Sequence, residues 1–345
     1  MKFSKKIFFF IFFYLLLANQ IKEKLSDYNV YFGDPHNLIT TEEFIPYDLI
    51  TPLFSDYAYK HRSIYIPENS KIQYHDKEVF QFPLGTVIAK TFYYPDDFND
   101  LSKGISLKET RIMIHNDNGW IGLPYIWNDS GTDAFLDVAG GIKNATWVDI
   151  EGKKQSIDYI IPNMNQCKGC HINNNKFIPI GPTARQLNSD YHYIDGSENQ
   201  IKKWDKLELF YSLPEFDKIP IIAKWNDPNN STLDKRARAW LDINCAHCHN
   251  LNGPANNTGL YLDYYETDMK SLGFFKTPVA AGRGSGNLKY DIVPGRPEES
   301  IMVYRFNSTD PGIMMPELGR TMVHKEGLEL IKDWIDNIDL SRVKF

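Results

Sequence analysis

The stretch Cys245-Ala246-His247-Cys248-His249 decides how the last third of this 345-residue chain is organised. It holds two cysteines three positions apart and a histidine directly after the second cysteine. The same C-x-x-C-H order occurs earlier, as Cys167-Lys168-Gly169-Cys170-His171. The chain has only four cysteines, so the two motifs use all of them. This complete use of one residue type predicts that both motifs carry the same chemistry.

C-x-x-C-H is the attachment signal for c-type heme. Two thiols on one helical turn can both form thioethers to one edge of a porphyrin, and the histidine that follows can bind the iron from one side. The sequence therefore predicts two covalently bound hemes c. The predicted attachment and axial residues are Cys167, Cys170 and His171 for the first heme, and Cys245, Cys248 and His249 for the second.

Three other uses of the cysteines are open. A Cys₄ zinc site usually joins pairs that are about 15–20 residues apart, whereas 74 residues separate Cys170 from Cys245. Two short-loop disulfides suit an exported chain, and thioredoxin-like redox pairs also use C-x-x-C. Because none of the three explains the histidine after each pair, heme attachment is favoured.

The first 20 residues predict an export signal. Lys2, Lys5 and Lys6 precede an apolar run from Ile7 to Ala18, and polar residues return at Asn19. About twelve helical residues reach roughly 18 Å, which is short of the roughly 30 Å bilayer core. A secretory signal is therefore favoured, with an uncleaved N-terminal anchor as the alternative. We expect a periplasmic or otherwise exported protein with no membrane span in the mature chain.

Composition excludes two broad classes of protein. Hydrophobic residues make up 42% of the chain and charged residues 24%, which is ordinary for a chain that buries a core and unlike a disordered one. The net charge of −6 argues against nucleic-acid binding, because no basic field is available to neutralise phosphates. The length predicts more than one domain.

The half of the chain before the first motif predicts β structure. Short β-rich runs alternate there with turn residues, and Asn116–Gly119 is a typical hairpin turn between two of them. A further run, Ile157–Ile161, predicts a strand that leads into the first motif. The other expected strands are Lys71–His75, Thr86–Tyr94, Thr110–His115 and Trp120–Trp127.

The second motif lies in a helical setting. Ser231 or Thr232 can cap a helix whose apolar residues, from Leu233 to Leu241, recur at helical spacing, and Leu328–Ile338 holds another apolar stripe. We therefore expect an α+β, multidomain fold in which a β-rich N-terminal domain precedes a mainly α-helical cytochrome c heme-binding region. The expected divisions are a signal peptide at 1–20, a β-rich domain at 25–155, a first heme c segment at 156–230, and a cytochrome c domain at 231–345.

Met315 is the predicted sixth ligand of the second heme iron, because it lies on a Pro-flanked loop, Pro311–Pro316, between the two helices; Met314 is the alternative. A Met/His pair fills both axial positions, which suits electron transfer. The first heme has no comparable methionine after His171. Its sixth position is predicted either to be open or to be filled by one of His61, His75, Met113, His115, Met164 and His192.

Other polar residues are expected in lesser roles. His247 is predicted at the surface or beside a heme propionate, and His324 at the start of a helix. Arginine forks suit carboxylates, so one or two loop arginines of the heme-bearing half can pair with propionates. These arginines are Arg185, Arg283, Arg296, Arg305 and Arg320.

Seven segments from residue 45 onward carry a resemblance to a known family: Leu53–Ala58 (LFSDYA), Phe82–Tyr93 (FPLGTVIAKTFY), Asn165–His171 (NQCKGCH), Ala237–His249 (ARAWLDINCAHCH), Ala280–Gly286 (AAGRGSG), Tyr290–Gly295 (YDIVPG) and Ser308–Arg320 (STDPGIMMPELGR). In combination they resemble a family of bacterial diheme c-type cytochromes of undetermined physiological role. The resemblance implies heme c at both motifs, an exported location and electron-transfer activity, and it implies no substrate.

These expectations lead to three functional hypotheses. The first is an exported diheme c-type cytochrome that transfers single electrons between redox partner proteins, and is thus a carrier rather than an enzyme. The second is a diheme peroxidase or oxidase, in which an open-coordinate first heme receives electrons from the second. The third is a binding module whose β-rich domain docks a partner protein or a small molecule, while the hemes report binding or relay electrons.

Overall fold

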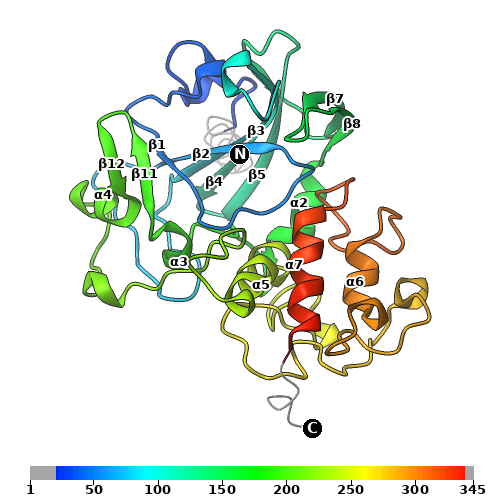
Figure 1. Cartoon of the computed structure of the whole chain (residues 1–345). Coiled ribbons are helices and arrows are strands. Elements are labelled where there is room, and N and C mark those ends of the chain that lie inside the picture. The colour runs from blue at the N-terminus through cyan, green and yellow to red at the C-terminus, as the bar shows by residue number, and fades with distance from the viewer. Residues whose placement is uncertain (1–20, 339–345) are drawn as a thin grey trace, which may run out of the picture.

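The computed structural model describes residues 21–338, so the predicted export signal lies outside the described part. A large sheet forms one part of the molecule (Figure 1), and helices α5 (Leu233–Leu241), α6 (Ile301–Phe306) and α7 (Lys325–Asp336) gather beside it. Helix α2 (Met164–His171) lies between the sheet and these helices. Within residues 21–338, no helix is long and apolar enough to cross a membrane.

The main sheet confirms the prediction of a β-rich N-terminal part. It is antiparallel throughout, and each strand pairs with its neighbours in sequence. The predicted Asn116–Gly119 turn joins two of its strands; the Asn118 amide donates to Asn116 Oδ1 (2.9 Å), and Gly119 takes a positive φ of 100°. The strands are β1 (Ile45–Tyr47), β2 (Tyr59–Tyr65), β3 (Val87–Pro95), β4 (Ile105–Asn116), β5 (Gly119–Trp127) and β6 (Ala134–Leu136).

One strand prediction is wrong, and several strands, among them β2, were not predicted. Lys71–His75 forms only isolated bridges at Ile72 and Gln73, because the short run has no neighbouring strand to pair with along its length. Strand β2 (YKHRSIY) is missing from the prediction. Its inward positions include Lys60 and Arg62, so the alternation of apolar and polar residues on which strand prediction depends is hidden.

A segment after the first motif packs onto one face of the sheet. Helices α3 (Ala184–Leu187) and α4 (Gln200–Lys206) bury Leu187, Ile201 and Trp204 completely against apolar residues of β2 and β3. A small hairpin of β11 (Asp190–Tyr193) and β12 (Gly196–Asn199) connects the two helices. This segment therefore shares a core with the strands that precede the first motif.

A second β ladder leads into the first motif. Strands β7 (Gly141–Val148) and β8 (Lys154–Ile161) pair antiparallel, and the end of β8 coincides with the predicted Ile157–Ile161 strand. Two residues later α2 begins. The very short strands β9 (Ile172–Asn173) and β10 (Lys176–Phe177) fold back beside it.

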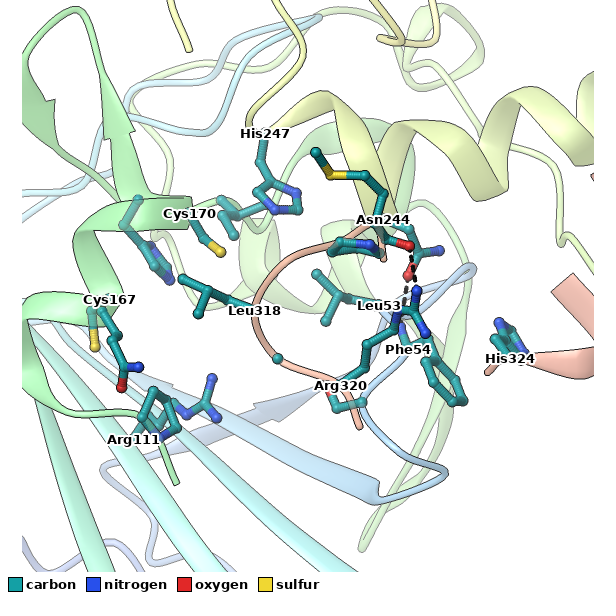
Figure 2. A pocket seen from close by; sticks show the side chains of 18 of the residues that line it. Leu53, Phe54, Arg111, Cys167, Cys170, Asn244, His247, Leu318, Arg320 and His324 are labelled. Atoms are coloured by element: carbon teal, nitrogen blue, oxygen red, sulfur yellow. Dashed lines mark hydrogen bonds between the residues drawn. The ribbon is translucent and has the colours of Figure 1, made fainter. Parts of the chain in front are cut away.

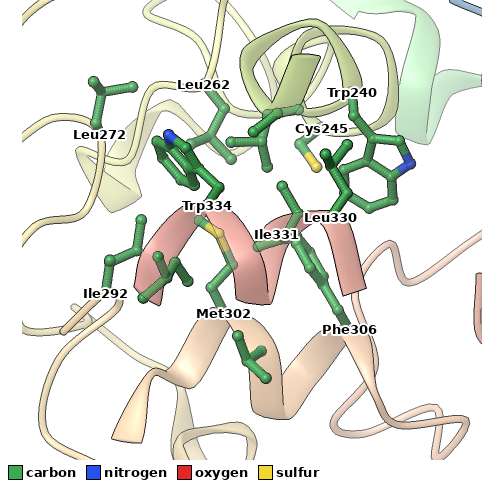
Figure 3. Packing of buried hydrophobic residues seen from close by; sticks show 14 of the residues in the cluster. Trp240, Cys245, Leu262, Leu272, Ile292, Met302, Phe306, Leu330, Ile331 and Trp334 are labelled. Atoms are coloured by element: carbon green, nitrogen blue, oxygen red, sulfur yellow. The ribbon is translucent and has the colours of Figure 1, made fainter. Parts of the chain in front are cut away.

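The C-terminal core lies between α5, α6 and α7 (Figure 3). Thr232 caps α5, as predicted, and accepts a hydrogen bond from the Lys235 amide (3.3 Å). Helices α5 and α7 pack against each other, and Trp334 Nε1 donates to Asp234 Oδ1 (2.9 Å). Cys245 belongs to the same apolar cluster and is 6% exposed, so the second motif is anchored in this core.

Two contacts join the loop before β2 to the C-terminal part. The Asp56 carboxylate accepts hydrogen bonds from the backbone amides of Thr321 and Met322, both at 2.7 Å. The ring of Phe54 stacks on His324, with centroids 4.2 Å apart and planes 7° apart. His324 is the N-cap residue of α7, as predicted. These contacts hold the sheet half and the helical half in one arrangement.

Ile331 tests the C-terminal core. It is fully buried, so Ile331→Ala should leave a cavity and lower the free energy of unfolding by about 3 kcal/mol. Ile194→Ala is the control, because Ile194 is 91% exposed and its truncation should change little. Denaturant unfolding of the two variants measures the difference. Equal effects would contradict the packing described.

Candidate functional site

The first C-x-x-C-H turn occupies α2, directly after β8. Asn163 and Gln166 form a reciprocal capping box at its start: the Gln166 amide donates to Asn163 Oδ1 (2.9 Å), and the Asn163 amide donates to Gln166 Oε1 (2.9 Å). This cap fixes the first turn of a helix that has no buried residue of its own. Cys167, Cys170 and His171 are thereby presented together at the edge of a pocket.

His171 is oriented by a backbone carbonyl. Its Nδ1 lies 2.8 Å from the Ile178 carbonyl, and its ring stacks on Phe177 at 5.2 Å. Burial lowers the pKa of His171 to about 4, so the ring is neutral at pH 7. A neutral imidazole whose Nδ1–H donates to a carbonyl keeps Nε2 free as a metal ligand.

The second motif follows α5 without a break. The helix continues into a π-helical turn, Asp242–Ala246, which carries Cys245. Burial lowers the pKa of His249 to about 4. The ring forms a hydrogen bond with the Leu260 backbone, and its Nδ1 lies 3.5 Å from Thr258 Oγ1. The two predicted iron-binding histidines thus share one design, a neutral ring held through Nδ1.

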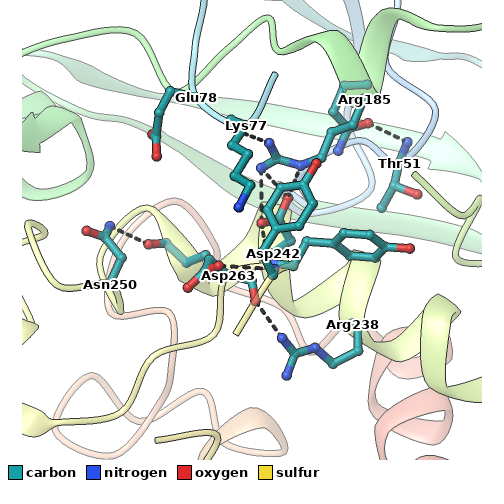
Figure 4. A network of polar contacts seen from close by, with 12 residues as sticks. Thr51, Lys77, Glu78, Arg185, Arg238, Asp242, Asn250 and Asp263 are labelled. Carbon is teal, nitrogen blue, oxygen red and sulfur yellow. Dashed lines mark hydrogen bonds and ion pairs between the residues drawn. The ribbon is translucent and has the colours of Figure 1, made fainter. Parts of the chain in front are cut away.

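A buried ion pair positions this second turn against the sheet half (Figure 4). Arg185 of α3 contacts both carboxylate oxygens of Asp242, at 2.9 and 3.1 Å from Nη2 and 3.2 Å from Nε. The Tyr264 amide donates to Asp242 Oδ1 (2.9 Å). Because both charges are mostly buried and mutually satisfied, the pair fixes the place of the turn three residues before Cys245.

The structure brings the two motifs into direct contact. The Cys248 thiol lies 3.2 Å from the Gly169 carbonyl, which belongs to the first motif. Cys170 Sγ, Cys248 Sγ and a ring nitrogen of His247 all lie within 4.8 Å of one another, a grouping that could also hold a metal ion. His247 therefore faces the first motif, and its Nδ1 is buried with no hydrogen-bond partner among the described residues.

Two of the three rival uses of the cysteines, the disulfides and the Cys₄ zinc site, fit this arrangement poorly. The four cysteines are free thiols and form no disulfide within residues 21–338. A closed Cys₄ zinc site is not formed either, since Cys167 and Cys245 stand outside the group of Cys170, His247 and Cys248.

Two adjoining pockets border the motifs. The first is small, about 100 Å³, and is lined by Cys167, Cys170 and His171 together with side chains of the sheet and of the loop after α6 (Figure 2). The second, about 640 Å³, is lined by Cys245, Cys248 and His249. That volume is within the usual range for a bound small molecule or cofactor. Each pocket thus has one complete C-x-x-C-H set on its wall.

Met315 lines the same pocket as His249, whereas Met314 is buried and does not line either pocket. This placement favours Met315 over its neighbour as the sixth ligand of the second site. The loop that carries it is held by Arg320, whose Nη2 donates to the Met315 carbonyl at 2.7 Å.

The candidates for the sixth position of the first heme are elsewhere. The first pocket is instead lined by His247, Met315 and His324, which sequence reasoning assigned to other roles. These three residues come from segments far from the first motif in sequence, and no local sequence pattern indicates that they line the first pocket. The six candidates that do not line it are His61, His75, Met113, His115, Met164 and His192.

The loop arginines divide into two groups. Arg305 lines the second pocket and could meet a ligand's carboxylate there, whereas Arg320 lines the first pocket but donates to the Met322, Ser308 and Met315 carbonyls. Arg185 is engaged by Asp242, and the remaining two form exposed ion pairs, Arg283 with Asp310 and Arg296 with Glu299.

Comparison of the chain with protein-family models, with curated proteins and with solved structures found no match.

His324 gives the site a pH dependence that can be measured. Burial among aromatic rings lowers its pKa to about 3, whereas an unfolded histidine titrates near 6.5. As the pH falls, His324 is therefore protonated in the unfolded chain before it is protonated in the folded protein. The free energy of unfolding consequently decreases between about pH 6.5 and pH 3. At pH 5 the loss from this residue should be about 2 kcal/mol.

His324→Gln removes this titration and keeps an acceptor for Trp240 Nε1, which donates to His324 Nδ1 at 3.0 Å. In the wild type, the free energy of unfolding falls between pH 7 and pH 5 partly because His324 titrates. In the variant, this fall should be about 2 kcal/mol smaller. His36→Gln, at a more exposed histidine, is the control. An unchanged pH slope in the His324 variant would contradict the assignment.

Proposed function

We propose that this protein is an exported diheme c-type cytochrome that transfers single electrons between redox partner proteins. The observation that carries the proposal is the contact of the two C-x-x-C-H turns, with the Cys248 thiol 3.2 Å from the Gly169 carbonyl. Hemes attached to two such turns have their bound edges side by side. Close cofactors suit a protein that passes electrons through its interior.

The side chains of both motifs support covalent heme attachment. Heme iron supplies reversible one-electron chemistry whose potential depends on the axial ligands. His171 and His249 are neutral and held through Nδ1, so each offers Nε2 to an iron. Met315 lines the second pocket and would offer its thioether as a further iron ligand, and a thioether ligand would raise the potential.

A diheme peroxidase or oxidase is the second candidate function. The observation that favours it is that none of the six histidines and methionines expected at the first heme lines the first pocket, where His247, Met315 and His324 are the remaining side chains that could bind an iron. A first heme with an open axial position could bind a small ligand. Electron paramagnetic resonance of the oxidised protein separates the two: two low-spin hemes support the carrier, and one high-spin heme supports the enzyme.

Heme content is the direct test of the proposal. The full chain, expressed in a host that attaches heme c, should carry two covalent hemes by mass spectrometry and by alkaline pyridine spectra. Cys170→Ser with Cys167→Ser should leave one heme, and Cys248→Ser with Cys245→Ser should leave the other. A full-length protein without covalent heme from such a host would overturn the proposal.

The axial methionine has a matched control in the next residue. Met315→Leu should abolish the sulfur-to-iron charge-transfer band near roughly 695 nm and lower the potential of one heme, because a thioether ligand is lost. Met314→Leu should leave band and potential unchanged, since Met314 does not line the pocket. Loss of the band in the Met314 variant alone would contradict this ligand assignment.

A further inference from the structure

A row of cations occupies the middle of one face of the main sheet. Arg62 of β2 pairs directly with Lys90 of β3, and Lys90 pairs directly with Arg111 of β4. Directly paired residues point to the same face with Cβ atoms about 5 Å apart. Lys60 lies on β2 two residues before Arg62, so its side chain points to the same face. We refer to these four residues, Lys60, Arg62, Lys90 and Arg111, as the cation row.

The row interrupts an otherwise apolar surface. On one side of it the same face packs against α3 and α4 through Ile64 and Ile88, and on the other side Phe92 and Tyr94 pack against β7 and β8. Burial and the neighbouring cations lower the pKa of Lys60 to about 7 and lower that of Lys90 strongly. Desolvated like charges are unfavourable unless something compensates them.

Protein carboxylates compensate only part of the row. Glu109, fully buried, accepts from Arg111 through both oxygens (2.5 and 2.8 Å), and Asp48 at the rim accepts from Arg62 (2.5 Å). Within residues 21–338, neither Lys60 nor Lys90 has a carboxylate at ion-pair distance. The ring of Phe92 lies under three of the cations, at 4.3 Å from Arg111, 4.8 Å from Lys90 and 5.9 Å from Lys60.

Three donors of the row are unused by the described residues. Arg62 is 3% exposed, yet its Nη2 is buried without any hydrogen-bond partner there. Lys90 Nζ has no hydrogen bond, and Arg111 uses Nε and Nη2 but not Nη1. Of the three, only Arg62 Nη2 is buried away from solvent, and such a donor without a partner costs about 1–3 kcal/mol. The other two belong to residues that line the first pocket, where an acceptor could reach them.

The row borders the first pocket. Lys90 and Arg111 line it together with Cys167, Cys170 and His171, and Figure 2 shows Arg111 reaching from the sheet beside Cys167. A heme joined to Cys167 would be held there by its thioether edge, whereas the propionates are on the opposite edge of a porphyrin. A propionate would then lie away from Arg111, so a separate anion is the better acceptor.

We propose that the cation row binds a small free oxyanion in the first pocket, held by Lys90 Nζ and Arg111 Nη1 beside the first C-x-x-C-H motif, with Arg62 adding positive charge next to Lys90. The inference depends on side chains of the sheet and not on the electron-transfer function, so either can fail without the other. Planar guanidinium groups and an ammonium group are the usual protein partners of such anions. The site adds a ligand-binding role to the β-rich half.

The test uses the full-length, heme-loaded protein and inorganic phosphate as the probe, with sulfate as a second oxyanion. Calorimetric titration in a low-salt chloride buffer should show one phosphate bound per chain. Lys90→Met should weaken binding at least tenfold, because it removes the central charge and keeps most of the volume. Lys143→Met is the matched control, a strand lysine paired with Asp129 away from the row, and should bind phosphate like the wild type.

A second measurement keeps the test independent of how well Lys90→Met folds. Phosphate should raise the melting temperature of the wild type and of Lys143→Met, and Lys90→Arg, which retains the charge, should keep most of the effect. Absence of phosphate and sulfate binding to the heme-loaded wild type would overturn the proposal. Equal binding to Lys90→Met and Lys143→Met would overturn it as well.

Discussion

The contact between two short turns, with the Cys248 thiol against the Gly169 carbonyl, is the constraint on which the rest of the structure depends. The turns are far apart in sequence and each is fixed from a different side. A capping box at the end of β8 holds the first, and the apolar core of α5 and α7 holds the second. The Arg185–Asp242 ion pair joins the second turn to α3, which packs on the main sheet.

Local patterns in the sequence predicted several helices and strands, whereas contacts between residues far apart in the sequence could not be predicted. The β4–β5 hairpin and the Thr232-capped helix carry their signals within a few residues, and both are present. Strand β2 was missed because charges occupy its inward positions. The grouping of Cys170 with His247 was missed because it joins segments with no shared pattern. The motif cysteines and histidines were identifiable from spacing alone; their mutual placement was not.

Strand β2, one of the strands that the sequence did not predict, contributes Lys60 and Arg62 to the cation row. A sheet built only for stability would place apolar residues there, as it does on either side along the same face. Retaining four neighbouring cations, three of them against the ring of Phe92, lowers stability unless a partner satisfies them. A departure from the alternating pattern is thus informative in itself, since such departures concentrate where a fold serves a purpose other than its own stability.

The loop that holds Phe54 and Asp56 has a consequence for how this architecture could be divided or recombined. It reaches from the sheet half to stack on His324 and to bind the Thr321 and Met322 amides. The helical half on its own would expose a ring and leave those amides to water. A graft of residues 231–345 onto another protein would have to bring this loop as well. The two halves therefore depend on this loop for part of their structure, and neither can be moved without it.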